Sequence, residues 1–185
     1  MKRFVFIVIF MALVLAGAAA QSVLPQPAAE ISFSFTRQSG SASNQYAIWI
    51  EDSRGQHVKT LFATRWTANG GWSRRPTSIP VWVRQSGLST VPRELIDSVS
   101  GATPRTGSLT YTWDGTDIRG ASVPDGDYVL ILEATLRWEN QVYYRAPIRL
   151  GRGTTAPQAS VEYTGGRDTT AERSMIGDVR VRVLR

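Results

Sequence analysis

The chain has 185 residues, of which 21 are Lys or Arg, 15 are Asp or Glu, six are Trp and none is Cys. Without cysteine the fold cannot use disulfides and must depend on its core. The formal net charge of +6 comes mainly from arginines scattered along the chain, whereas nucleic-acid-binding domains concentrate Lys and Arg on one face or helix. We therefore predict no nucleic-acid partner.

Residues 1–20 have the pattern of a cleavable export signal. Lys2 and Arg3 precede an apolar run over residues 4–15, and three alanines end the segment at Ala20. The run is shorter than the roughly 20 apolar residues that span a bilayer. We predict cleavage after Ala20 and a periplasmic mature protein that does not span the membrane.

Residues 21–29 contain two prolines and no apolar period, which predicts a flexible linker before a single domain over residues 30–185. Apolar and polar residues alternate over residues 31–35, the period of a half-buried strand. Two further apolar runs, residues 46–50 and 58–62, flank a turn and predict a hairpin.

The next segment predicts fewer strands. Turn-forming residues (Thr, Asn, Gly, Ser and Pro) over residues 66–76 predict a long loop that carries Trp66, Trp72, Arg74 and Arg75. These side chains could clamp a flavin ring or a glycan by stacking, although Trp66 could equally belong to the core. Residues 81–83 predict a strand, and residues 92–98 predict the one helical turn of the chain.

The second half again has the pattern of strands. Residues 109–113 alternate, and residues 128–132 and 142–150 predict a pair joined at Glu139 and Asn140. Residues 151–178 are weakly patterned and predict loose order, before a closing strand over residues 179–183. Short strands with frequent turns and no long helix predict an all-β antiparallel β-sandwich.

Two stretches, residues 48–61 and residues 112–128, carry a resemblance. The second contains Trp-Asp-Gly followed by Val-Pro-Asp-Gly-Asp-Tyr, and both resemble the immunoglobulin-like module of the flagellar hook-capping protein. The resemblance implies an immunoglobulin-like sandwich of the hook-capping type. With the export signal, residues 46–150 resemble a predicted periplasmic protein family (domain of unknown function 2271), which implies architecture and compartment but no activity.

Residues 97–103 read Asp-Ser-Val-Ser-Gly-Ala-Thr and resemble the acceptor motif of bacterial flavin transferases. In that motif an aspartate precedes Ser/Thr-Gly-Ala-Thr, and FMN is attached to the last threonine. The residues that match are Asp97, Ser100, Gly101, Ala102 and Thr103. The resemblance implies covalent FMN at Thr103, delivered by a flavin transferase. Small residues there would let the backbone approach the nucleotide closely, whereas the alternative is a plain turn.

Other candidate sites have little support. His57 is the only histidine, and we expect it to be exposed in a hairpin rather than to bind a metal. The spacing of Asp114, Asp117, Asp125 and Asp127 is typical of turns, because it lacks the dense ligand pattern of a calcium loop. No Gly-x-Ser-x-Gly elbow is present, so we predict no catalytic site of its own.

Two functions remain open from the sequence. The first is an exported carrier that presents FMN on Thr103 to a membrane electron-transfer protein. The second is a cofactor-free binding or assembly module of the periplasm, which would need an exposed strand edge or apolar patch.

Overall fold

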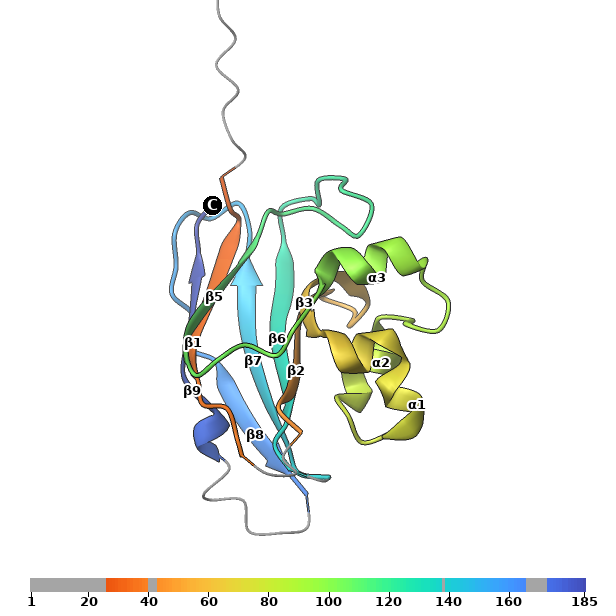
Figure 1. Cartoon of the computed structure of the whole chain (residues 1–185). Helices are drawn as coiled ribbons and strands as arrows, with labels where there is room; N and C mark the ends of the chain where they lie inside the picture. The colour runs from red at the N-terminus through yellow and green to blue at the C-terminus, as the bar shows by residue number, and fades with distance from the viewer. Residues whose placement is uncertain (1–25, 40–42, 138, 166–172) are drawn as a thin grey trace, which may run out of the picture.

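The computed structural model describes residues 26–39, 43–137, 139–165 and 173–185 and contains two β-sheets packed face to face (Figure 1). The smaller sheet has the strand order β5 (Gly107–Trp113), β1 (Ala29–Phe35), β9 (Ile176–Val183). The larger has the order β4 (Ser100–Gly101), β3 (His57–Thr64), β2 (Gln45–Asp52), β6 (Asp127–Thr135), β7 (Gln141–Arg149), β8 (Ser160–Thr164). Apart from the parallel pair β3–β4, these strands pair antiparallel. The predicted all-β sandwich is confirmed, and its immunoglobulin-like subtype stays a prediction.

The predicted hairpins are confirmed by the register. β2 pairs with β3 from Ala47 opposite Ala63 to Glu51 opposite His57, and β6 pairs with β7 along its whole length. Strand β8 pairs with β7 in a segment where no strand was expected. β1 begins at Ala29, the last residue of the predicted linker. The predicted export signal over residues 1–20 lies outside the described residues.

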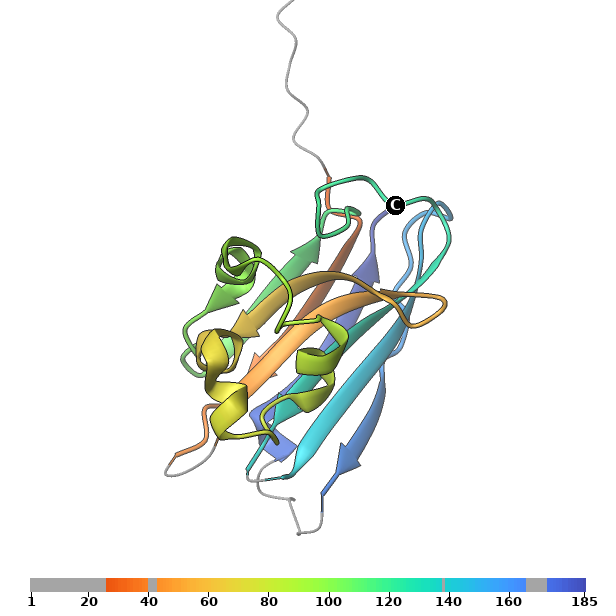
Figure 2. The same ribbon diagram turned by 90° about the vertical axis from the view of Figure 1, so that its right-hand side faces the viewer.

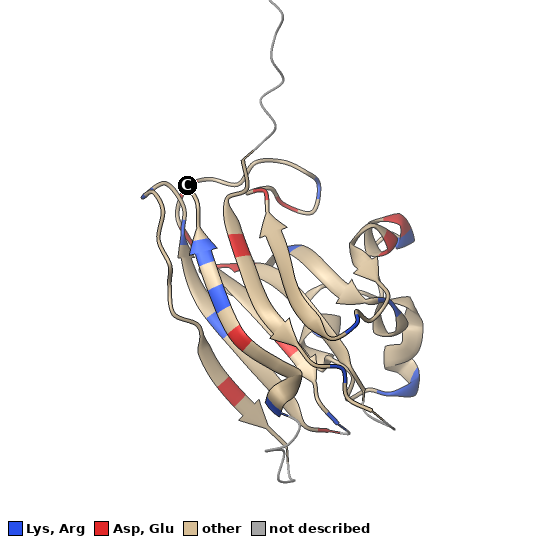
Figure 3. Ribbon diagram, turned by 60° about the vertical axis from the view of Figure 1, so that its left-hand side comes forward, with Lys and Arg blue, Asp and Glu red and all other residues tan. Residues whose placement is uncertain are grey.

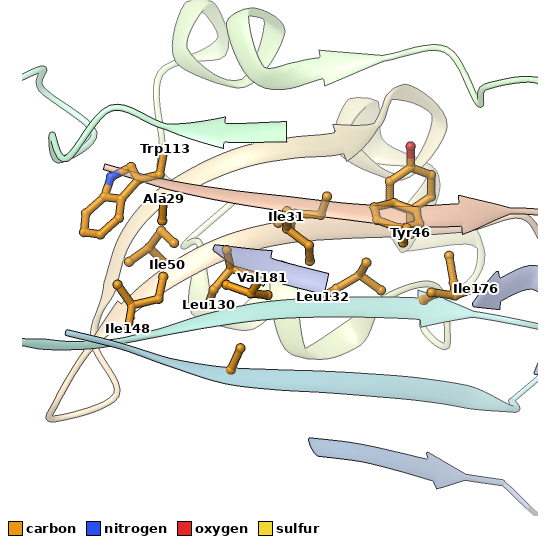
Figure 4. Packing of buried hydrophobic residues seen from close by; sticks show 14 of the residues in the cluster. Ala29, Ile31, Tyr46, Ile50, Trp113, Leu130, Leu132, Ile148, Ile176 and Val181 are labelled. Atoms are coloured by element: carbon orange, nitrogen blue, oxygen red, sulfur yellow. The ribbon is translucent and has the colours of Figure 1, made fainter. Parts of the chain in front are cut away.

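The main core lies between the two sheets (Figure 4). The inward residues of β1 alternate with half-buried polar ones, as the period of the sequence predicts. Trp113 is fully buried and meets the ring of Tyr128 edge-on at 5.2 Å. Its indole N–H donates to the carbonyl of Thr116 (2.9 Å), and Tyr128 Oη donates to the carbonyl of Pro124 (2.7 Å). The side chain of Trp113 therefore holds the Trp-Asp-Gly turn against the core, and the side chain of Tyr128 holds the Pro-Asp-Gly turn.

A layer of short helices covers the outer face of the larger sheet (Figure 2). Its elements are η1 (Thr67–Gly71), α1 (Trp72–Arg74), α2 (Pro80–Gln85) and α3 (Arg93–Val99), while the turn η2 (Arg173–Met175) precedes β9. Trp49 of β2 and Ile131 of β6 point into a second core with Trp82 of α2. This layer explains why β2 is buried on both faces.

Two predictions for this layer are wrong. Residues 81–83 form part of helix α2 rather than a strand, and residues 66–76 contain the helical turns η1 and α1 rather than one long loop. The short apolar triplet around Trp82 fits either period, so a distant contact decides its conformation. Pro80 suits the first turn of α2, where its missing N–H has no intrahelical partner. The predicted helical turn at residues 92–98 is confirmed as α3, although it is not the only helix.

Charged residues are spread over several elements (Figure 3). β9 presents Arg180 and Arg182 on its exposed side, and Arg182 lies 3.8 Å from Glu30 of β1. Other arginines lie on β7 and in the helical layer, and several pair with carboxylates, such as Arg149 with Asp127 at 2.8 Å. Among the described helices, none is long and apolar enough to cross a membrane.

Candidate functional site

The five acceptor-like residues form one run that leads from a helix to a sheet edge. Asp97 lies in α3, with half of its side chain exposed, and Arg93 pairs with it at 3.5 Å. Ser100 and Gly101 form β4, which pairs in parallel with Ala63 and Thr64 of β3. The structure therefore brings the predicted residues together by continuity of the chain and fixes the middle of the run against β3.

Beyond Gly101 the chain crosses from the larger sheet to the smaller one. Ala102 is exposed and Thr103 is half-buried, and the crossing ends where β5 begins at Gly107. The hydroxyl of Thr106 accepts the backbone N–H of Arg37 (3.0 Å) and anchors the end of the crossing beside the end of β1. Thr103 thus lies on a surface connection between two fixed points, which we call the crossover (residues 102–106).

Gly101 has a packing reason to be glycine. A Cβ built on it would lie 2.6 Å from the ring of Phe62, a distance that no real contact reaches. Phe62 is in turn held by Tyr46 and Tyr111, whose rings lie 5.1 and 5.0 Å away. Close approach of backbone to an aromatic ring therefore requires the glycine at this position.

The two hydroxyls of the motif are not explained by the fold. The Oγ of Ser100 is buried and has no hydrogen-bond partner among the described residues. Within the same part of the chain, no hydrogen bond engages the hydroxyl of Thr103. Because buried hydroxyls are normally paired, an alanine at position 100 would serve the fold at least as well.

A pocket of about 320 Å³ lies at the end of β3. We call it the Trp66 pocket; it is lined by Arg65, Trp66, Asn69, Gly70, Gly71, Ser73 and Arg74. Trp66 is 45% exposed, so the alternative that it belongs to the core is wrong. Trp72, by contrast, packs against the second core. The sequence pattern indicates this region as a candidate site but does not indicate Arg65. Arg65 lines the pocket because it directly follows the end of β3.

A second cavity of about 310 Å³ lies between β3, α2 and α3, and it is mostly apolar. We call it the His57 cavity; its lining includes His57, Thr60, Trp82, Leu88, Val91 and Ile96. Thr60 Oγ1 accepts the indole N–H of Trp82 (3.0 Å) and lies 2.8 Å from His57 Nε2. These contacts are satisfied together when Thr60 donates to Nε2 and the proton of the imidazole is on Nδ1.

The expected exposed position of His57 is wrong. The side chain is mostly buried at the start of β3, and burial lowers its pKa from 6.5 to about 4. Desolvation disfavours the charged imidazolium. His57 is therefore neutral at physiological pH and contributes to the fold as a hydrogen-bonding group.

The turn aspartates bind their own backbone. Asp114 Oδ1 accepts the N–H of Thr116 (3.0 Å), and Asp117 Oδ1 accepts the N–H groups of Arg119 (2.8 Å) and Ala121 (2.9 Å). The part of the chain that the structure describes holds no group of three or more His, Cys, Asp or Glu side chains that could bind a metal ion. These geometries are those of Asx turns.

The sequence was compared with protein-family models and with curated proteins. One family model, described as predicted periplasmic protein (DUF2271), matches residues 28–169, which include the helical layer and all the strands named above except β9. No curated protein matches the chain. The family's description agrees with the predicted periplasmic location. The chain therefore belongs to the DUF2271 family of predicted periplasmic proteins.

Proposed function

We propose that this periplasmic protein is a carrier of covalent FMN, attached to the hydroxyl of Thr103, and that it has no catalytic site of its own. In this function a flavin transferase loads the protein, and a membrane electron-transfer protein exchanges electrons with the bound flavin. The observation that carries the proposal is the crossover itself, which presents a threonine whose hydroxyl has no partner among the described residues.

The remaining motif residues support this function in different ways. Asp97 is exposed on α3, within reach of an approaching transferase. β4 fixes the chain immediately before Ala102, so the acceptor hydroxyl is held at a defined distance from the sheet edge. Ser100 keeps a buried hydroxyl that the fold leaves without a partner among the described residues, so packing does not account for a serine at this position.

The attachment chemistry is a phosphoryl-group transfer. A phosphoester bond forms between Thr103 Oγ1 and the phosphorus of FMN, and the phosphoanhydride bond of a flavin dinucleotide donor breaks. A nucleoside monophosphate leaves, and the hydroxyl proton passes to a base of the transferase. Once attached, the flavin supplies reversible electron transfer, and this chain orients the flavin and tethers it to a stable sandwich.

The test is co-expression of the full exported chain with a flavin transferase, followed by intact-mass measurement. We expect a gain of one FMN less one water. Thr103→Ser keeps the hydroxyl and should still be labelled, whereas Thr103→Val should not. Thr112→Val, on the exposed face of β5, is the matched control and should be labelled like the parent. Unmodified protein in cells that label a known acceptor would contradict the proposal.

The alternative function is a cofactor-free binding module, and one observation favours it. Strand β8 is an edge of the larger sheet, and its Val161 is 50% exposed. Such an edge can accept a strand from a partner chain. A photocrosslinker placed at Val161 should then capture that partner in cells, and recovery of free monomer alone would count against this function.

A further inference from the structure

We infer that the Trp66 pocket is the seat of the flavin ring carried by Thr103, with the indole of Trp66 stacked on the ring and Arg65 and Arg74 facing its negative charge. The inference rests on the proposed attachment of FMN. It assigns the residues that hold the flavin ring and that adjust its reduction potential.

Trp66 and Thr103 each follow closely after one of two paired strands, β3 and β4. β3 and β4 run in parallel, with Thr64 opposite Gly101. Two residues further along one chain is Trp66, and two residues further along the other is Thr103, so each lies within about 7 Å of that last pair. In Figure 2 the connection that follows β4 passes beside the first helical turn after β3. The phosphate and ribityl chain of FMN can therefore extend from Thr103 towards the pocket.

The Trp66 pocket contains an indole that packs against glycine backbone. A Cβ at Gly71 would lie 2.5 Å from the ring of Trp66, so the indole rests on glycine backbone with no side chain between them. The ring is nevertheless 45% exposed, which leaves part of its surface free for a flat partner. Stacking of aromatic rings is favourable beyond the effect of the area that it buries. A supported, half-exposed indole in a pocket of about 320 Å³ fits a planar ring system.

The Trp66 pocket carries two positive charges. Arg65 and Arg74 line the pocket, both are exposed, and neither makes an ion pair within the described residues. By contrast, Arg54, Arg93, Arg149 and Arg182 each pair with a carboxylate. FMN has an anionic phosphodiester when attached, and its ring gains negative charge on reduction. Two unpaired guanidinium groups beside a stacking indole thus match both the ligand and its reduced state.

The experiment uses the full chain loaded by a flavin transferase, with the mass of each variant measured first. Stacked tryptophan quenches flavin fluorescence by electron transfer. We therefore expect Trp66→Ala to raise the fluorescence of the bound flavin severalfold and to reduce its visible circular dichroism. Arg65→Ala/Arg74→Ala should lower the reduction potential of the flavin. Arg180→Ala, an exposed arginine of β9 that makes no ion pair within the described residues, is the matched control and should change neither quantity.

The outcomes separate the two proposals. Loaded Trp66→Ala protein that retains its far-ultraviolet circular dichroism but has the flavin fluorescence of the parent would overturn the ring seat and leave the attachment intact. Absence of FMN from the parent chain would overturn the attachment, and the ring seat with it. A fluorescence increase confined to Trp66→Ala, with normal loading, supports both.

Discussion

The carboxylate of Glu133, near the C-terminal end of β6, accepts the backbone N–H of Trp82 across 2.7 Å and thereby caps helix α2 from the sheet below it. The other oxygen accepts the N–H of Val81 (3.1 Å) and the hydroxyl of Tyr143 (2.8 Å). Glu133 is fully buried, so one side chain supplies the first turn of α2 with two of the acceptors that a helix start lacks.

Removal of this cap should destabilise the fold. Glu133→Ala leaves two backbone N–H groups buried without their acceptor, at a cost of about 3 kcal/mol in the free energy of unfolding, whereas the Tyr143 hydroxyl keeps Gln141 Oε1 as an acceptor at 2.6 Å. Glu133→Gln keeps one oxygen and should cost less. Chemical denaturation of both variants measures the difference. Equal stability of Glu133→Ala and the parent would show that α2 does not need the cap.

The titration of Glu133 gives a second, separate prediction. Burial raises its pKa above the ordinary value of 4.5, although the N–H groups of Trp82 and Val81 oppose the shift. Protonation therefore favours the folded state, and the contribution is full below pH 4.5 and lost as the pH rises through the raised pKa. From pH 4.5 towards neutrality, the stability of the parent should fall relative to Glu133→Gln. A constant difference across that range would contradict the direction of the shift.

The burial of His57 predicts the opposite dependence. Its pKa falls from 6.5 to about 4, so the unfolded chain binds more protons between these values. The contribution of neutral His57 is full above pH 6.5 and is lost as the pH falls towards 4, by up to about 3 kcal/mol. His57→Gln should flatten this part of the stability profile. An unchanged profile in the variant would assign the acid sensitivity to other groups.

Packing at the motif can be tested apart from labelling. Gly101→Ala places a methyl group against Phe62 and should destabilise the fold by about 1–3 kcal/mol. Phe62→Leu should relieve part of that cost in the double variant, because the two sites are in contact. Ala102→Ser, one residue further on and exposed, is the matched control. Additive effects of the two core changes would show that the ring is not the obstacle.

Substitution of Ser100 tests recognition by the transferase and stability of the fold separately. Since its buried hydroxyl has no partner among the described residues, Ser100→Ala should change the free energy of unfolding by less than about 0.5 kcal/mol. If the transferase reads this hydroxyl, the same variant should lose most of its FMN. Intact mass and denaturation on one preparation measure both effects. Full labelling of Ser100→Ala would remove Ser100 from the recognition motif.

Strands were predictable here where one face is buried, as in β1, because alternation then reports the buried face directly. The helical layer was less so. The sequence predicts a strand at Trp82 because its apolar triplet is too short to reveal a period, and the cap from Glu133 is distant in sequence. It predicts an exposed His57 because it reveals neither helix α2 nor the packing of α2 and α3 around the cavity that His57 lines. The motif over residues 97–103 was visible in the sequence, but its parallel pairing with β3 depends on tertiary contacts.

The most direct test of the flavin-carrier function is peptide mapping of protein made with a flavin transferase. Trypsin should release residues 94–105 as one peptide, because Arg93 and Arg105 flank the segment and no Lys or Arg lies between them. We expect this peptide to be heavier by one FMN less one water, and we expect fragmentation to assign the addition to Thr103. An unmodified peptide from cells that label a control acceptor, or an addition on another residue, would contradict this function.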